Sequence, residues 1–200
     1  MTKNLLLLIL IHFSIFSFGQ VSFGIKVGIN VNDVAIKGKP DDIEFSPENS
    51  VGFHVGLYGV MKLAEKLSFI PEFQFSKRGY SDFGYRFNLN YLELPMLFSY
   101  SPIKWLNIDI GPDFGYKISA VIKDGSFRNK IDFMYNRNFD FGLNGGLRFN
   151  IAEKVSVLAR YYYGLTFIND LQLRDENNNS NGEMLEYNRN VQLGLSYKIK

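Results

Sequence analysis

The sequence lacks cysteine altogether, so it can form neither disulfides nor a thiol-anchored lipoprotein. It has only two histidines, His12 and His54, and one of them falls in the amino-terminal segment described below. A formal net charge of only +2 over 200 residues gives no indication of nucleic-acid binding. Outside the amino-terminal segment, no apolar run is long enough for a transmembrane helix. These absences predict no metal site and no cofactor.

The first twenty residues are typical of a secretory signal peptide. Lys3 provides an early positive charge, an apolar core extends from Leu5 to Phe16, and small residues precede an expected cleavage after Gly19. The alternative is an uncleaved membrane anchor, but the apolar core is short for a spanning helix, which needs about 20 residues. We therefore predict a signal peptide over residues 1–19 and one exported domain over residues 20–200.

What is abundant is aromatic residues and glycine, with 19 Phe, 12 Tyr and 18 Gly. The segment SFGIKVGINV, residues 22–31, alternates strictly between apolar and polar or small residues. Such a period of two predicts a strand with one apolar face. The same period recurs along the chain, in segments that begin at Val51, Leu67, Tyr91, Leu106, Phe139, Val155 and Val191. Most of these eight segments reach about ten residues, the length that a tilted strand needs to cross a bilayer.

The connections between these segments alternate between long and short. Long polar segments lie near 32–50, 79–84, 121–138 and 167–189, whereas the turns at 62–66, 101–104 and 152–154 are short. Outer-membrane barrels have short periplasmic turns and longer external loops. The pattern therefore predicts an all-β fold, an eight-stranded antiparallel up-and-down transmembrane β-barrel. A soluble lipocalin-like barrel, with its apolar face turned inward, is the alternative.

In the membrane barrel, the charged side chains of the strands would point into the lumen. An eight-stranded lumen is filled by side chains, and charges buried there must be paired. Ion pairs around Arg160, Glu72 and Glu93 are therefore our hypothesis for the centre of the barrel. Counting from the periplasmic turns places a lumen polar cluster at similar depth, formed by Lys26, Glu72, Glu93, Asp109 and Arg160.

Two local features need separate explanations. Tyr85, Phe87 and Leu89 have the opposite parity to the apolar residues that follow them, and a β-bulge near Asn90 would reconcile the two halves. His54 lies between two glycines on the predicted lumen face, without a serine or aspartate placed to form a catalytic pair. We therefore predict a packing role for His54 and no catalytic residues.

Several stretches resemble a known family. They are FGIKVGIN after the signal peptide, NYLELPMLFSY, NIDIGPDFGYKIS, FDFGLNGGLRF and ARYYYGLTFI, and together they extend over essentially the whole exported chain. The sequence is similar to the PorT-like, or porin-family, outer-membrane β-barrel proteins. That resemblance implies an eight-stranded barrel in the outer membrane of a Gram-negative bacterium. The founding member is linked to a protein-secretion apparatus, but a fold by itself does not transfer a role.

From the sequence we expect a small barrel that acts by structure, binding or as an accessory protein, and not by catalysis. Its expected partners are outer-membrane lipid, lipopolysaccharide, and a protein at the external loops or the periplasmic rim. The segment 121–138 mixes basic and aromatic residues, so it could meet lipopolysaccharide phosphates. The alternatives are a narrow passive pore for small solutes and an outer-membrane lipid-modifying enzyme.

Overall fold

The computed structural model describes residues 21–39, 46–125, 127–135, 137–174 and 180–200. The predicted signal peptide lies outside these residues. Each strand of the wall pairs antiparallel with the next, and the last pairs with the first, so the predicted eight-stranded up-and-down barrel is confirmed. The wall consists of β1 (Val21–Lys37), β2 (Glu48–Lys62), β3 (Leu67–Asp82), β4 (Tyr85–Ile103), β5 (Leu106–Asp124), β7 (Phe139–Asn150), β8 (Val155–Gly164) and β10 (Ser180–Lys198).

Three short elements lie off the wall. Strand β6 (Phe127–Lys130) pairs with β5, and the 3-10 helix η1 (Asp132–Met134) follows it. Strand β9 (Asn169–Arg174) pairs with the first part of β10. In the described part of the chain, no helix is long and apolar enough to cross a membrane.

The two faces of the wall have opposite polarity. On β1, Lys26 and Asn30 are 2% and 0% exposed, whereas Ile25 and Val27 on the other face are 46% and 55% exposed. Polar side chains therefore fill the lumen, and apolar ones cover the outside. This arrangement suits a lipid environment, and it is the reverse of the lipocalin-like alternative.

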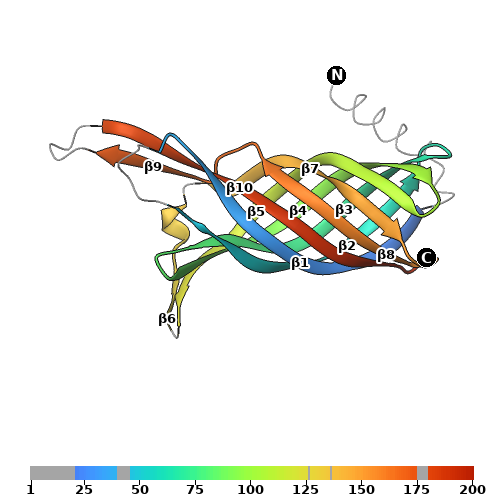
Figure 1. Cartoon of the computed structure of the whole chain (residues 1–200), viewed down its shortest axis with the longest axis horizontal. Helices are drawn as coiled ribbons and strands as arrows, with labels where there is room; N and C mark the ends of the chain where they lie inside the picture. Colours follow the sequence, from blue (N-terminus) through green and yellow to red (C-terminus); the bar gives the residue numbers. More distant parts are fainter. Residues whose placement is uncertain (1–20, 40–45, 126, 136, 175–179) are drawn as a thin grey trace, which may run out of the picture.

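The two ends of the barrel differ, as Figure 1 shows. At one end the strands are joined by short turns, and the carboxyl terminus lies there too. At the other end β9 and β10 continue well beyond the wall, and β6 projects from it. Because outer-membrane barrels have short periplasmic turns, we assign the first end to the periplasm and the second to the cell surface.

The external segments contain more strand than the sequence indicated. We expected a polar loop at 79–84, but β3 and β4 continue to a tight turn at Phe83 and Gly84. Both residues have positive φ, 48° and 80°, as a two-residue hairpin turn requires. A glycine suits this conformation, whereas the phenylalanine is strained in it. The barrel wall therefore rises above the membrane as a hairpin at this position.

The expected irregularity near Asn90 is present, but it lies on the neighbouring strand. Asn90 pairs with Ser119 and Tyr91 with Lys117, so the extra residue, Ile118, belongs to β5. Strand β4 keeps its alternation, and Leu89 therefore points inward, where it is fully buried. It packs with other apolar residues in a cluster beneath the external segments, formed by Leu89, Tyr91, Ala120, Ile131, Tyr135 and Ile168.

This external apolar cluster reverses the polarity of the lumen. The Tyr135 hydroxyl lies 3.4 Å from that of Tyr80, and burial raises the pKa of Tyr135 well above its ordinary value. The interior of the wall is thus mainly polar at membrane level, apart from a small apolar cluster of Tyr58, Ile70 and Leu97, and it has a larger apolar cluster at the external end. Apolar residues inside a water-exposed part are what a soluble domain requires, so the reversal marks where the wall leaves the bilayer.

Candidate functional site

Ion pairs fill the periplasmic half of the lumen. Arg160 on β8 donates from Nη1 to both carboxylate oxygens of Glu72 at 2.9 Å, and from Nη2 to Asp109 Oδ2 at 2.9 Å. Lys26 Nζ also pairs with Glu72, and Arg148 Nη2 lies 3.3 Å from Asp109 Oδ1. We call these five residues from five strands the inner ion cluster. Its cations and carboxylates link these strands across the lumen.

A second group lies nearer the cell surface, and Arg78 is at its centre. Arg78 Nε is 2.6 Å from Glu93 Oε1, Nη1 is 2.9 Å from Asp140 Oδ2, and Nη2 is 3.8 Å from Asp113 Oδ2. We call Arg78, Glu93, Asp113 and Asp140 the outer ion cluster. The guanidinium carbon also lies 3.8 Å from the centroid of the Tyr162 ring, within cation–π range.

The structure divides the residues expected to form one lumen polar cluster. It brings Lys26, Glu72, Asp109 and Arg160 together in the inner ion cluster. Glu93 is not with them, because it pairs with Arg78 and accepts a hydrogen bond from Gln74. Sequence reasoning did not single out Arg78 as a site residue, although its inward parity was visible. The structural role of the whole set remains a proposal.

His54 belongs to a buried polar network and not to an accessible site. Its Nδ1 lies 2.7 Å from Asn30 Oδ1, and Asn30 Nδ2 donates to Ser76 Oγ at 2.9 Å. All three side chains are completely buried, so a substrate has no access to them. No group of three or more potential metal ligands occurs among the residues that the structure describes.

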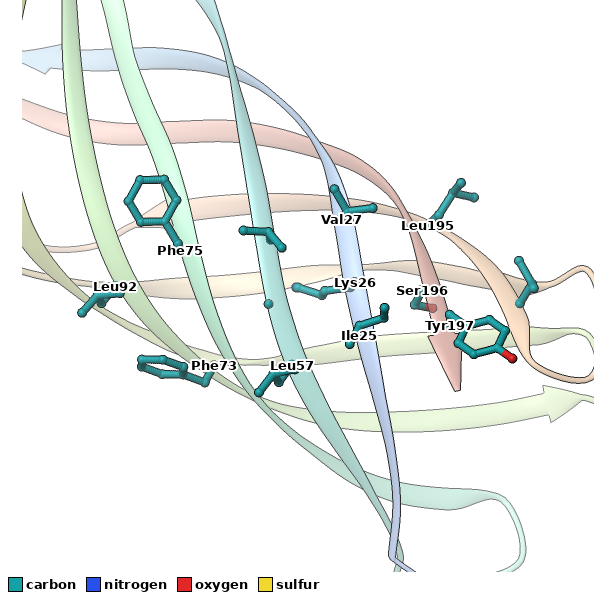
Figure 2. A pocket seen from close by; sticks show the side chains of 13 residues that line it. Ile25, Lys26, Val27, Leu57, Phe73, Phe75, Leu92, Leu195, Ser196 and Tyr197 are labelled. Carbon is teal, nitrogen blue, oxygen red and sulfur yellow. The ribbon is translucent and has the colours of Figure 1, made fainter. Parts of the chain in front are cut away.

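The outer wall carries a hollow of about 630 Å³ that faces the membrane. Figure 2 shows that its lining comes from several neighbouring strands. The side chains that cover it are apolar and exposed, which suits contact with lipid chains. They include Ile25, Val27, Leu57, Phe73, Leu92 and Leu195.

The external segments end in exposed aromatic side chains. Phe83, at the strained hairpin turn, is 77% exposed, and Phe133, in η1, is 84% exposed. Phe127, at the start of β6, is exposed as well. Large apolar side chains exposed at the tips of external segments are candidates for a binding surface, because their contact with water costs free energy that a partner would recover.

Below these tips, basic residues face each other on adjacent strands. Arg86 on β4 pairs directly with Lys123 on β5, and Lys123 with Arg128 on β6. All three positive charges also act on the ammonium group of Lys77 on β3. We call these four residues the basic row. None of them forms an ion pair within the described part of the chain.

The barrel wall, its apolar outside and its ion-paired inside together define an integral outer-membrane β-barrel. The family model described as outer membrane protein beta-barrel domain matches residues 15–170, and the chain belongs to that family. The protein is accordingly located in the outer membrane. A search of curated proteins finds no match to the sequence.

Solved structures of other outer-membrane proteins are similar to this chain. Neisserial surface protein A is 13% identical, with a TM-score of 0.55, over 90% of this chain and 99% of that one. The attachment invasion locus protein Ail of Yersinia pestis is 15% identical, with a TM-score of 0.46, over 90% of this chain and 99% of that one. OprG from Pseudomonas aeruginosa is 14% identical, with a TM-score of 0.47, over 89% of this chain and 95% of that one. At 13% identity, the similarity to Neisserial surface protein A shows the fold alone.

Proposed function

We propose that the protein is a surface-binding or accessory protein of the outer membrane that engages a protein partner through its external segments. The observation that carries this proposal is the set of exposed aromatic tips, Phe83, Phe127 and Phe133, held above a blocked lumen. Exposed phenylalanine side chains do not help an external segment to stay soluble, so their presence favours a binding role.

The backbone at Phe83 supports a binding role. A bulky residue at positive φ is a steric outlier, and such strain persists where the surrounding structure enforces it. Here β3 and β4 pair up to the turn, with Asp82 opposite Tyr85, so the hairpin holds the ring outward. The segment below η1 is held by buried Ile131 and Tyr135, which fixes Phe133 in position. The tips are thus preorganised for a partner.

The lumen supports binding over transport or catalysis. Arg160 bridges β3 and β5 in the inner ion cluster, and Arg78 bridges β4 and β7 in the outer one. A solute would have to break both sets of buried ion pairs, and a substrate could not reach His54. The lumen is therefore a structural plug. The resemblance to PorT-like proteins makes a secretion or surface assembly the first place to look for the partner.

The basic row supports a second contact, with the surrounding lipid. It lies just beyond the apolar band, since Lys77 follows Phe75 on the same face of β3. Phosphate groups of lipopolysaccharide are the anions at this level of the outer leaflet. We infer that the row holds the barrel in the lipopolysaccharide layer, with its tips above it.

The experiment is affinity capture from intact outer membranes after cross-linking. An affinity tag fits at Gly125, since no atom lies within 4 Å of the position that a Cβ would occupy there. We expect a stoichiometric protein partner, and its loss in the double variant Phe83→Ser/Phe133→Ser. Serine removes the apolar contact without disturbing a buried residue.

Asn129→Ser is the matched control, because Asn129 is exposed in β6 of the same external segment. Its capture yield should equal that of the unaltered protein. Recovery of the barrel alone, or equal capture by the double variant, would contradict the proposal.

A further inference from the structure

The periplasmic mouth of the lumen opens into a polar vestibule of about 630 Å³. Its walls come from the strand ends and from the turns that join them, and Trp105 stands among them. A hollow of this size is within the range of small-molecule sites, roughly 300–1,000 Å³. The vestibule is therefore large enough for a small ligand that enters from the periplasm.

The charges around the vestibule have almost all one sign. Its only acidic lining residue is Glu153. Five basic residues line it, namely Lys62, Lys104, Arg148, Lys154 and Lys198. Within the described chain the four lysines form no ion pair. Clefts lined by one sign of charge concentrate ions of the opposite sign, so this mouth attracts anions.

The floor of the vestibule also has an excess of positive charge. Arg148 and Tyr58 line both the vestibule and the small space around the inner ion cluster, so they separate the two. That cluster holds three cations, Lys26, Arg148 and Arg160, but only two carboxylates, Glu72 and Asp109. Because a buried charge without a partner is costly, one more anion at this floor would complete the set.

Arg148 is the residue that has capacity left for that anion. Its Nη2 donates to Ser99 Oγ at 3.0 Å and to Asp109 Oδ1 at 3.3 Å. Its Nε is buried and has no hydrogen-bond partner among the described residues. The Arg148 side chain is still 11% exposed, so its guanidinium, beside the lysines of the turns, is well suited to phosphate oxygens.

The outer ion cluster stops such an anion from passing through. It sets one cation, Arg78, against three carboxylates, Glu93, Asp113 and Asp140. The lumen is thus positive toward the periplasm and negative toward the cell surface. An anion that enters from the periplasm is bound at the vestibule and repelled beyond it.

We propose that the periplasmic vestibule is a binding site for a polyvalent, phosphate-bearing anion, held by Arg148 at the floor and by the lysines of the turns. The phosphate comes from a soluble molecule or from a phospholipid headgroup of the inner leaflet, since both present the same oxygens. This site does not depend on the external binding surface proposed above.

The test uses Trp105, which is the only tryptophan of the chain and lines the vestibule. The purified barrel in a non-ionic maltoside detergent is titrated at low salt with inorganic pyrophosphate, and separately with short-chain phosphatidylglycerol, while tryptophan fluorescence is recorded. We expect a saturable change with at least one probe. The probe that binds more tightly identifies the source of the phosphate.

Exposed turn residues give variants that should still fold. Lys104→Gln/Lys154→Gln should weaken binding roughly five- to tenfold, because two exposed charges are lost. Glu153→Gln should strengthen it, because the one acidic lining residue is neutralised. Lys66→Gln is the matched control, since Lys66 lies in a periplasmic turn but does not line the vestibule, and its affinity should be unchanged. Absence of saturation with both probes, or an equal loss in Lys66→Gln, would overturn the proposal.

Discussion

Arg160 shows how much of the barrel interior depends on single residues. It is almost fully buried, and one guanidinium satisfies carboxylates from two other strands, Glu72 on β3 and Asp109 on β5. Replacing both partners of a buried ion pair by apolar residues can leave the stability unchanged. Removing only one partner leaves an unpaired charge in a medium of low dielectric constant, which is strongly destabilising. The barrel should therefore respond very differently to these two kinds of change.

We predict that Arg160→Met lowers the free energy of unfolding by about 3–5 kcal/mol, because it leaves two carboxylates with less compensation. Adding Lys26→Met and Glu72→Gln removes the rest of this ion pair without leaving a buried cation unpaired, so it should recover part of this loss. The measurement is urea unfolding of the barrel in detergent micelles. Lys130→Met, at an exposed position of β6 outside the basic row, is the control and should unfold like the unaltered protein. A loss that the added substitutions deepen would show that the pairing is not what stabilises the site.

Sequence reasoning placed the charged residues in the lumen and grouped Arg160 with Glu72, but it also grouped Glu93 with them. Strand alternation places Glu93 and Arg160 inside, since parity depends only on position along the strand. Which cation meets which carboxylate depends on strand tilt and on the register between strands, and neither is visible in one strand. Glu93 thus lies beside Arg78 and not beside Arg160. The inward parity of Arg78 was visible, but its place in a cluster was not.

At the scale of elements, the face of β3, β4 and β5 that carries the apolar side chains changes along the length of these strands. Toward the periplasm their outward residues are apolar, as Phe73, Leu92 and Ile110 are. Beyond Ile118 the apolar residues turn inward, and Arg86 and Lys123 occupy the outer face. The sequence predicted loops in this region because its polar residues break the membrane pattern. The hydrogen-bonded strands continue there because a second, soluble-type core supports them.

The basic row gives two predictions about melting temperature, one without lipopolysaccharide and one with it, and they have opposite signs. Like charges directly opposite on adjacent strands destabilise a sheet, by up to about 1 kcal/mol per pair. Without lipopolysaccharide, Arg86→Gln/Lys123→Gln should therefore melt at the same temperature as the unaltered protein or higher. With lipopolysaccharide added, the unaltered protein should gain more in melting temperature than the variant. Band-shift electrophoresis after heating measures both.

Two controls separate phosphate binding from other effects of lipid. Lys66→Gln, in a periplasmic turn, should gain as much from lipopolysaccharide as the unaltered protein does. Lipopolysaccharide stripped of its lipid A phosphates should remove the difference between variant and unaltered protein. Two results together would show that the basic row does not bind phosphate. The variant would melt at a lower temperature than the unaltered protein in plain detergent, and lipopolysaccharide would raise both melting temperatures equally.

At the scale of the whole molecule, the barrel combines a closed wall, a lumen that contains buried ion pairs and two unlike ends. The wall and its topology were predictable, because alternating faces and alternating connection lengths both reflect the membrane. The charge layering of the lumen was not, since it arises only when eight strands are brought together. The positive vestibule, the negative outer ion cluster and the apolar external cluster are properties of the assembled barrel.

The last prediction concerns transport, the main alternative to a binding role. In planar lipid bilayers the unaltered protein should give no steady single-channel conductance, because both ion clusters obstruct the lumen. The variant Arg78→Ala/Arg160→Ala/Glu72→Ala, if it folds, should conduct, since shorter side chains leave room for water between the strands. Band-shift electrophoresis establishes folding before the recording. Steady conductance from the unaltered protein would mean that the ion pairs open in the membrane, and the barrel would then be a narrow pore whose negative outer ion cluster favours cations.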